Sequence, residues 1–507
     1  MSPYGEINLA VPQTNYQSPT TNMDFLTVNR NQLLTASGKP VRLRGFNAGG
    51  WLSMEDFVNG FPGAEHTLRE TMTRIVGGDK TDFFFERWLK TFFTEADVKT
   101  IKRLGANVIR LPFNYRRFER DDKPFEYPDS GFALLDSAVS WCARHGIYLI
   151  LDMHAAQGWH NPDWHADSAH MHVMLYSHKD FEDRFAALWG AIAKRYKNEA
   201  AVAGYALLNE PVTRVEYESY DPSYFDWDGL NRVHRRAAEA IRRADKRHIL
   251  FLEGDNFSSE YDGLDVTFDS QIVLSLHNYI EATDCEGEYP GVTDGEHWDK
   301  ARVAQRFAEH SGVRKAREHG IPMLVGEFGA LHWQAGAEAK YRVRAVADQI
   351  EVYEEAGAHW TIWNYKDIGI RRGVFRPKLK SKYRQLVEPL LQARAAVADW
   401  TNDSDTEAGR AIQRLMDTLD EFLAAQNIQP IERGRFKQAM LFGYNAHLLQ
   451  VAYADLFKDK SQNEIRAILD SFAIENCQPQ KIYADMLTKK FKSRHPSPDT
   501  RHLTPDT

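Results

Sequence analysis

Short apolar runs alternate with longer amphipathic stretches over most of the chain. The apolar runs are continuous rather than alternating with polar residues, which is typical of strands in a parallel sheet buried on both faces. Eight of them occur, at residues 41–47, 106–113, 146–154, 202–210, 247–254, 271–279, 321–329 and 358–365. The stretches between them have helical periodicity, and the strongest lie at residues 94–105, 132–146, 181–196, 229–245 and 339–357. Two of these stretches end at Gly105 and Gly146, where a helix C-terminus favours glycine.

This alternation predicts an α/β protein, and eight strands with intervening helices predict a (β/α)8 TIM barrel. A doubly wound open sheet is the alternative fold. That fold is disfavoured because no glycine-rich G-x-G-x-x-G turn follows the first strand.

The chain divides into four predicted regions. Residues 1–24 form an N-terminal arm rich in Asn, Ser, Thr and Pro, and residues 25–398 form the barrel, beginning with a hairpin. Residues 399–493 are predicted to be helical only, and residues 494–507 to be a disordered tail. In the helical region, Ser461 and Glu464 form a capping-box pattern. A helix at 408–426 places on one face Ile412, Leu415, Met416, Leu419, Phe422 and Leu423. These helices could cap the barrel, join two copies in a homo-oligomer, or bind another partner.

Composition and charge narrow the class of protein. The chain has 507 residues, of which 43% are hydrophobic, and its formal net charge is −8. This acidic balance argues against binding to nucleic acid or to anionic membrane surfaces. No run of about 18 apolar residues predicts a membrane span, and the first residues lack the basic and apolar parts of a secretion signal. With only three cysteines, far apart, we expect reduced thiols and a cytoplasmic location.

Polar and aromatic residues stand at the ends of the predicted strands, and this is the pattern from which chemistry can be predicted. The active site of such a barrel is built at the carboxyl ends of its strands. The run YALLNEPV ends in Asn209 and Glu210, and Pro211, which has no N–H to donate, helps to end the strand. Burying an unpaired Glu210 would be costly, so we expect it to face a cleft. The strand-end candidates are Arg110, His154, Asn209, Glu210, Glu253, His277, Tyr279, Glu327 and Trp363.

Glu210 and Glu327 are the predicted catalytic pair. Two carboxyls about 5–5.5 Å apart suit retaining glycoside hydrolysis, whereas about 6.5–9.5 Å leaves room for a water and inversion. The sequence leaves this separation open. Arg110 and Tyr279 are expected to hold Glu327 ionised, with a low pKa, whereas Glu210 beside neutral Asn209 is expected to have a raised pKa.

These motifs together resemble the retaining glycoside hydrolases of family 5. The resemblance covers about residues 25–395 and rests on RGFNAGGWL, VIRLPF, LDMH, LLNEP, LHNY, VGEFG and TIWNY in order. It implies that Glu210 is the acid/base and Glu327 the nucleophile. It also implies that Asn209 holds the sugar 2-hydroxyl, that Trp363 forms a platform under the sugar, and that Arg110, His154, His277 and Tyr279 line the site. The chemistry needs no cofactor and no metal.

Several further residues have two readings. Trp51 and Trp333 are predicted subsite walls because aromatic faces stack on sugars, while Trp159 and Trp164 are better explained by loop packing. Glu253 either touches substrate or pairs with a loop. The histidine-rich segment 154–178 could bind a metal, but no H-E-x-x-H or cysteine pair accompanies it, which favours a substrate-facing loop.

The sequence therefore predicts a retaining β-glycoside hydrolase acting on a carbohydrate substrate. Long loops at the active face favour exo-acting cleavage of β-glucosidic or β-mannosidic bonds in short glycosides or glycoconjugates. The alternatives are an endo-β-glucanase or β-mannanase acting on polymers, a transglycosylase, and a non-catalytic carbohydrate-binding barrel.

Overall fold

The computed structural model describes residues 21–213, 225–333, 335–397, 407–428, 440 and 446–493. Its centre is a closed barrel of eight strands in the order β12-β13-β4-β5-β6-β7-β8-β9, and every neighbouring pair is parallel. The barrel strands are β4 (Arg44–Asn47), β5 (Val108–Asn114), β6 (Tyr148–Ala155), β7 (Val202–Ala206), β8 (Ile249–Leu252), β9 (Ile272–His277), β12 (Met323–Glu327) and β13 (His359–Ile362). Each of the eight predicted strands is present, so the (β/α)8 prediction is confirmed.

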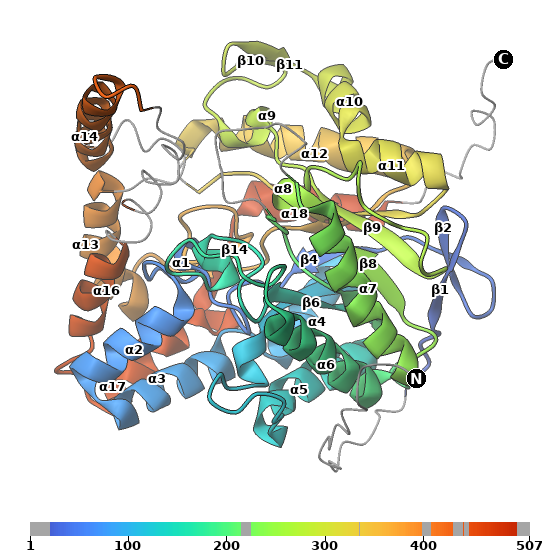
Figure 1. Ribbon diagram of the computed structural model, residues 1–507, viewed down its shortest axis with the longest axis horizontal. Coiled ribbons are helices and arrows are strands. Elements are labelled where there is room, and N and C mark those ends of the chain that lie inside the picture. The colour runs from blue at the N-terminus through green and yellow to red at the C-terminus, as the bar shows by residue number, and fades with distance from the viewer. Residues whose placement is uncertain are drawn as a thin grey trace.

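Helices surround the barrel (Figure 1). They are α4 (Glu95–Leu104), α5 (Asp129–His145), α6 (Lys179–Tyr196), α7 (Trp227–Ala244), α10 (Lys300–Glu309), α11 (Ser311–His319) and α12 (Ala339–Glu355). Between β8 and β9 the chain forms only the short α8 (Asp255–Ser258). Gly105 and Gly146 end α4 and α5 with φ of 106° and 61°, the left-handed conformation that glycine adopts without strain.

The amino end of the barrel is closed by the predicted hairpin. Strands β1 (Leu26–Asn29), β2 (Gln32–Thr35) and β3 (Pro40–Val41) form a small antiparallel sheet. Leu26 and Leu33 from this sheet form one buried cluster with apolar residues on or beside the barrel strands: Leu43, Val108, Ile150, Ala203, Ala206, Ile249, Phe251, Val273 and Leu324. This cluster, called the basal cluster below, is a buried apolar layer beneath the polar residues further along the same strands.

Two of the long loops predicted at the active face contain regular structure. The segment after β4 forms α1 (Asp56–Asn59), α2 (Glu65–Val76) and α3 (Gly78–Thr91). The segment after β9 forms α9 (Glu281–Asp284) and a hairpin of β10 (Gly291–Thr293) and β11 (Glu296–Trp298). In the segment after β6, the structure has only the 3-10 turn η2 (Trp164–Ala166) before α6. The long connection predicted after the first strand, at about 47–93, therefore forms helices.

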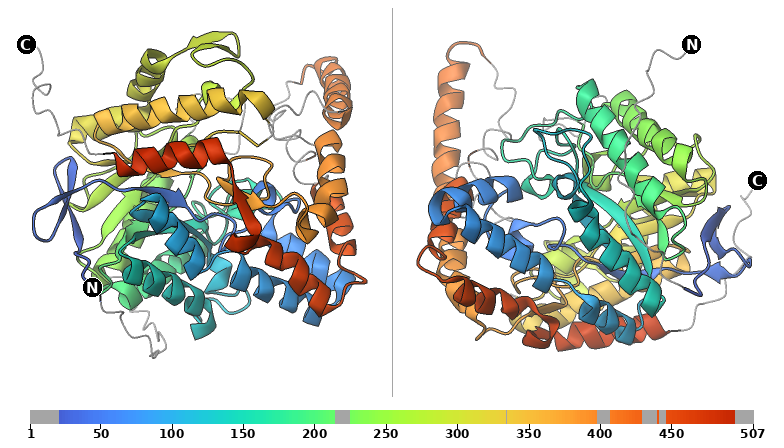
Figure 2. Two further views of the ribbon diagram at one scale, coloured as in Figure 1. Left: turned by 180° about the vertical axis from the view of Figure 1, so that it is seen from behind. Right: turned by 90° about the horizontal axis from the view of Figure 1, so that it is seen from below.

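The last part of the chain packs onto the barrel rather than standing apart from it. It comprises α13 (Lys382–Val397), α16 (Ala446–Asp455), α17 (Gln462–Leu469) with the predicted Ser461–Glu464 capping box, β15 (Cys477–Pro479) and α18 (Lys481–Lys492). Strand β15 pairs with β14 (Phe375–Pro377), which follows the barrel. Helix α18 runs along α12 (Figure 2, left), where Phe491 stacks on Trp360 with ring centres 5.0 Å apart. Residues 446–493 thus share the core of the barrel.

Helix α14 (Glu407–Ala424) is different. It stands at one edge of the molecule with α13 and α16 (Figures 1 and 2). Of its predicted apolar face, Ile412 and Met416 are buried, whereas Leu415, Leu419 and Phe422 are exposed. The predicted arm up to residue 20, residues 399–406 and the predicted disordered tail lie outside the described residues. None of the helices in the described part of the chain has the length and hydropathy that a membrane crossing requires.

Candidate active site

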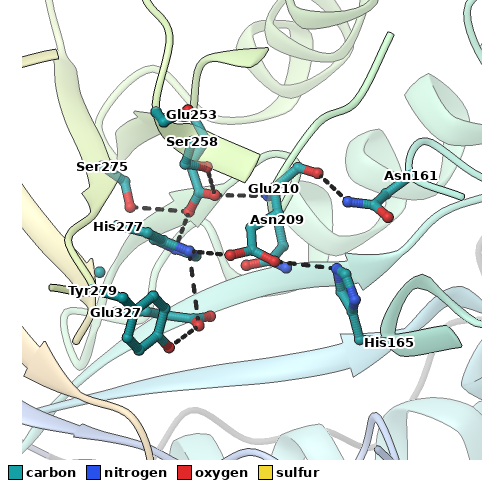
Figure 3. Close-up of polar contacts among 12 residues, drawn as sticks. Asn161, His165, Asn209, Glu210, Glu253, Ser258, Ser275, His277, Tyr279 and Glu327 are labelled. Atoms are coloured by element: carbon teal, nitrogen blue, oxygen red, sulfur yellow. Dashed lines mark hydrogen bonds and ion pairs between the residues drawn. The ribbon is translucent and has the colours of Figure 1, made fainter. Parts of the chain in front are cut away.

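The two predicted catalytic carboxylates meet at the carboxyl end of the barrel (Figure 3). Glu327 is the last residue of β12, and Glu210 lies in the turn after β7. One carboxylate oxygen of Glu210, one of Glu327 and a ring nitrogen of His277 all lie within 4.8 Å of one another. Strand β7 ends at Ala206 rather than at Glu210, but the N–H of Asn209 still donates to the carbonyl of Met153 at 3.1 Å. The predicted juxtaposition is therefore present.

The backbone at Glu210 adopts an unusual conformation. Its φ is +48°, a left-handed value that costs a residue with a side chain roughly 1–2 kcal/mol. Contacts on both sides hold it there. Its N–H donates to Oε2 of Glu253 at 2.8 Å, and its carbonyl accepts from the Asn161 amide at 2.7 Å. These contacts turn the side chain of Glu210 out of the strand direction and toward Glu327.

Arg110 holds Glu327 from beneath. Its guanidinium is fully buried and donates to Oε1 of Glu327 at 2.7 Å, while the Tyr279 hydroxyl donates to Oε2 at 2.9 Å. The same guanidinium donates to Oδ1 of Asn209 at 2.7 Å and to Oε1 of Glu253 at 3.0 Å. The contacts predicted for Arg110 and Tyr279 are present. The planar guanidinium of Arg110 links Glu327 at the end of β12 to Asn209 after β7, and so aligns the two segments that carry the glutamates.

Three histidines surround the pair. Nδ1 of His277 lies 2.7 Å from Oε1 of Glu210 and 3.7 Å from Oε2 of Glu327, so this ring bridges the carboxylates. Nε2 of His165 lies 3.2 Å from the other oxygen of Glu210. His154 lies further back, with Nε2 3.9 Å from Oε1 of Glu327. Together with Arg110, these rings supply the positive charge that a cluster of buried carboxylates requires.

The carboxylates in turn raise the pKa of these histidines. For His154, burial alone would lower the pKa, but Asp152 at 2.7 Å and Glu55 at 3.2 Å raise it to about 10. The pKa of His277 is well above its ordinary value, because Glu327, Glu253 and Glu210 together outweigh burial. That of His165 is raised too, where the contact with Glu210 outweighs burial.

The pKa order expected for the two glutamates is reversed. Burial would raise the pKa of Glu210, but His277 and His165 bring it below the ordinary range. For Glu327, burial and the neighbouring charge of Glu210 outweigh His277 and Arg110, and its pKa is raised. The prediction considered Asn209 as the neighbour of Glu210 and did not include the histidines contributed by β9 and by the segment after β6. In the unliganded site, the pair and His277 hold their protons as one coupled group.

Asn209 and Trp363 lie where sugar contacts were predicted. Oδ1 of Asn209 is used by Arg110, whereas its Nδ2 is buried without a hydrogen-bond partner among the described residues. An unpartnered amide donor in this position suits a sugar hydroxyl. The Trp363 ring lies parallel to that of His154, with centres 5.4 Å apart and an angle of 1° between their planes.

Two predicted substrate contacts lie elsewhere. Trp51 is fully buried, donates to the carbonyl of Leu89 at 2.8 Å and stacks on Trp141, so its prediction as a subsite wall was wrong. Its position in the sequence placed it after the first strand, but its ring turns into the core between barrel and helices. Glu253 is also fully buried beneath the pair and is occupied by internal partners, which favours the structural reading.

The three remaining tryptophans of the predicted loops all contact other protein groups. Trp333 is half-buried, with the Arg376 guanidinium 3.7 Å above its ring centre and its indole donating to the carbonyl of Gly373. Trp159 donates to the carbonyl of Asp167 at 2.7 Å, as expected for loop packing. Trp164 lies edge-on to Phe57, with ring centres 6.2 Å apart.

Sequence reasoning missed four residues of the site: Glu55, Asp152, Asn161 and His165. Asp152 stands two positions before His154, so the two-residue period of a strand places both on one face. That signal was readable. The other three lie in connecting segments, whose course the sequence pattern does not give.

The described residues include one group whose geometry could hold a metal ion, Glu210, His277 and Glu327. The proton on His277 that the raised pKa implies occupies the nitrogen a metal would need. The positive charge of Arg110 and the three histidines already faces the carboxylates. The donor set therefore fits acid–base chemistry better than a bound cation.

Comparison with known proteins agrees with this geometry. Residues 59–369 match the family model described as cellulase (glycosyl hydrolase family 5). The chain is 33% identical over 488 residues to a beta-xylosidase of Phanerodontia chrysosporium, covering 92% of this chain and 97% of that protein. It is 28% identical to endoglucanase C of Acetivibrio thermocellus, over 56% of this chain and 87% of the relative.

Among solved structures, the beta-glucanase SdGluc5_26A of Saccharophagus degradans aligns with a TM-score of 0.48 and 18% identity, covering 72% of this chain and 92% of that one. The family model and the full-length relative are sufficient to place the chain: it belongs to glycosyl hydrolase family 5 and is a glycoside hydrolase.

Proposed function

We propose that the protein is a retaining β-glycosidase in which Glu327 is the nucleophile and Glu210 the acid/base. The observation that carries this proposal is the short separation of the two carboxylates, whose closest oxygens lie within 4.8 Å. Inversion needs about 6.5–9.5 Å between the carboxyls to admit a water, whereas retention needs about 5–5.5 Å.

The surroundings of each carboxylate support its role. Glu327 is fixed by Arg110 and Tyr279 on both oxygens, which aims one of them at an anomeric carbon above the barrel. It attacks that carbon and forms a glycosyl-enzyme, while Glu210 gives a proton to the departing oxygen. Esterification removes the charge of Glu327, so Glu210 loses its repulsive neighbour and then accepts a proton from the incoming water.

The adjacent histidine supplies a route for the first proton. His277 contacts both carboxylates and holds a proton in the free site. When a sugar separates Glu327 from His277, transfer of this proton over 2.7 Å converts Glu210 to the acid that the first step needs.

For the substrate, we propose short or terminal β-glycosides, cleaved in exo fashion. The relative that aligns over nearly its whole length is named a beta-xylosidase. The connections after β4 and β9, which leave the carboxyl end of the barrel, are long and form helices α1–α3 and the β10–β11 hairpin. Endo-acting cleavage is the second candidate, because the partial match to endoglucanase C favours it. Transglycosylation would use the same intermediate.

The test is hydrolysis of aryl β-glucosides, β-xylosides and β-mannosides, with the anomeric form of the first product followed by NMR. Release of one sugar in the β-form supports a retaining exo-glycosidase, and an α-product contradicts retention. A fall in viscosity of a β-glucan, without release of single sugars, would instead support endo action. Transfer to an added sugar acceptor, in preference to water, would identify a transglycosylase.

A further inference from the structure

The histidine-rich segment 154–178 has no role in the mechanism so far, apart from His154. Besides His154, which lies 3.9 Å from Glu327, the segment brings His165 to a catalytic carboxylate: its Nε2 lies 3.2 Å from Oε2 of Glu210 (Figure 3). His277 takes the other oxygen of the same carboxylate at 2.7 Å. The carboxylate of Glu210 is therefore contacted on both oxygens, by His165 from the segment after β6 and by His277 from β9.

We propose that His165 is a positioning residue for Glu210: its Nε2, 3.2 Å from Oε2, keeps the second carboxylate oxygen in place. This inference rests on the proposed role of Glu210 as the acid/base. His165 does not face the nucleophile directly among the contacts seen, so its effect on the reaction passes through Glu210.

The segment that carries His165 is anchored to the same turn as Glu210. The His160 ring donates to the carbonyl of Asn209, and the Asn161 amide donates to that of Glu210 at 2.7 Å. The N–H of Val212 returns a bond to the carbonyl of His160 at 3.0 Å. Because three consecutive contacts tie residues 160–161 to residues 209–212, His165 approaches Glu210 from a fixed position rather than from a free loop.

A second anchor lies on the far side of His165. Asp167 accepts from the Asn114 amide and from Arg116, each at 3.0 Å, and contacts His66 at the same distance. The burial of His165, 8% exposed, excludes most of the water that would otherwise screen its charge. A buried charge in a rigid segment is suited to positioning a carboxylate.

Other ionisable groups also face this contact and must be considered. Glu55 from the segment after β4 and Asp163 from its own segment favour the charged ring of His165. The charged ring of His154 opposes it, with its centre 6.2 Å away. His160 carries no charge here, because burial and the neighbouring histidines lower its pKa to about 3. The negative charge of Glu327 disfavours the ionised form of Glu210, whereas the positive charge of His277 favours it. Glu210 lies 3.2 Å from His165, so its carboxylate and the ring stabilise each other's charge.

The expected consequence is a change in the pH at which Glu210 works as an acid. The basic limb of kcat/KM reports protonation of the acid group. Without the charge of His165, the pKa of Glu210 rises, and we expect the basic limb to move to higher pH by about one unit. The limb should move in both His165→Gln and His165→Phe, since both remove the charge.

A comparison of leaving groups separates positioning from structural damage. A phenyl β-glycoside needs proton donation, whereas a 2,4-dinitrophenyl β-glycoside departs without it. In His165→Phe, which has no donor, we expect kcat/KM to fall about tenfold on the phenyl substrate and less than about twofold on the dinitrophenyl substrate. His165→Gln keeps an N–H near the place of Nε2 and should retain phenyl activity within about threefold.

His170→Gln is the matched control, because His170 is exposed in the same segment and its ring lies beside that of His172 rather than at the catalytic carboxylates. It should behave as the wild type. The proposal is overturned if the limb stays in place in both His165 variants, or if both substrates slow equally. Melting temperatures verify folding, and His165→Gln remains a test if His165→Phe does not fold.

Glu210→Ala tells a failure of this inference from a failure of the proposed function. It should show the same leaving-group selectivity more strongly, with azide restoring the turnover of the glycosyl-enzyme. If Glu210→Ala slows both substrates alike and azide has no effect, the acid/base assignment is wrong. If Glu210→Ala behaves as expected while His165→Phe does not, only the role of His165 is wrong.

Discussion

The two ends of the barrel use the same strands for opposite purposes. Near the amino end, β5, β6, β8 and β9 contribute Val108, Ile150, Phe251 and Val273 to the basal cluster. Two positions further along, β5, β6 and β9 carry Arg110, Asp152 and Ser275, and Glu253 follows directly after β8. Since side chains of a strand repeat every two residues, each of these pairs lies on one face of its strand.

The difference shows how the barrel can hold a buried charged site. The basal cluster is apolar and is sealed by the β1–β3 sheet, so it stabilises the fold by excluding water. The upper layer holds three buried acids, Asp152, Glu253 and Glu327, and the half-buried Glu210, and Arg110 and the histidines match their charge. We therefore expect the basal cluster to contribute most to stability and the polar upper layer to carry catalysis. Four predictions test this division, from the largest effect to the smallest.

Glu327→Gln should separate activity from stability most clearly. We expect kcat to fall by at least about 10⁴-fold, because the amide cannot act as the nucleophile. The free energy of unfolding should change by less than about 1 kcal/mol, since removing one of several repelling carboxylates relieves the site. Enzyme assays and urea denaturation measure the two quantities. A large loss of stability would show that the upper layer also supports the fold.

Arg110→Met should damage both properties. It leaves Asp152, Glu253 and Glu327 without their shared cation, and an uncompensated buried charge costs about 3–5 kcal/mol. Urea denaturation should show this loss, and activity should be undetectable. Arg110→Lys is the comparison: it keeps the charge but loses the fork geometry, so it should regain part of the stability and little of the activity. Wild-type stability in Arg110→Met would contradict charge matching.

Leu33→Ala tests the lower end alone. Leu33 is 1% exposed in the basal cluster, and removing such a side chain costs about 2–5 kcal/mol in unfolding free energy. We expect kcat/KM to stay within about twofold of the wild type, because no catalytic group moves. Leu34→Ala, on the half-buried neighbouring residue, is the matched control and should cost less. A fall in kcat/KM matching the loss of stability would mean that the two ends are coupled.

The charge of His154 should give the upper layer a pH-dependent stability. Its pKa is raised from its ordinary value of 6.5 to about 10 in the folded protein, chiefly because Asp152 outweighs burial. The stabilisation is therefore full below pH 6.5 and is lost as the pH rises toward 10. We expect the melting temperature of His154→Gln to lie below that of the wild type at pH 6, with a gap that narrows toward pH 10. A constant gap would show that the ring acts through packing alone.

Much of the site was readable from local pattern. Glu210, Glu327, His277 and Tyr279 all stand at or near strand ends, and a barrel brings such ends to one rim whatever its loops do. Arg110 lies deeper, as the third residue of β5, and reaches the rim from beneath. The hairpin, the capping box at Ser461 and the glycine ends of α4 and α5 are likewise local, because backbone conformation and nearest neighbours specify them.

The errors came from contacts between distant segments. Trp51 has the composition of a sugar-binding site, yet its ring packs against Trp141 in the core. For the C-terminal helices the sequence left three roles open, and only the fold shows that Phe491 stacks on Trp360 of the barrel and that β15 pairs with β14. The pKa order of Glu210 and Glu327 was reversed because His165 and His277 approach from elements far away in sequence.

The sequence by itself determined the order of strands and helices, the family to which the chain is related and the residues that line the rim. Periodicity and motifs are properties of neighbouring residues, so they can be read without the fold. Only the tertiary structure decided the separation of the two carboxylates, the left-handed turn at Glu210 and the histidines that set its charge. Electrostatic interaction depends on distances of a few ångströms and on exclusion of water, and both arise only when remote segments pack together.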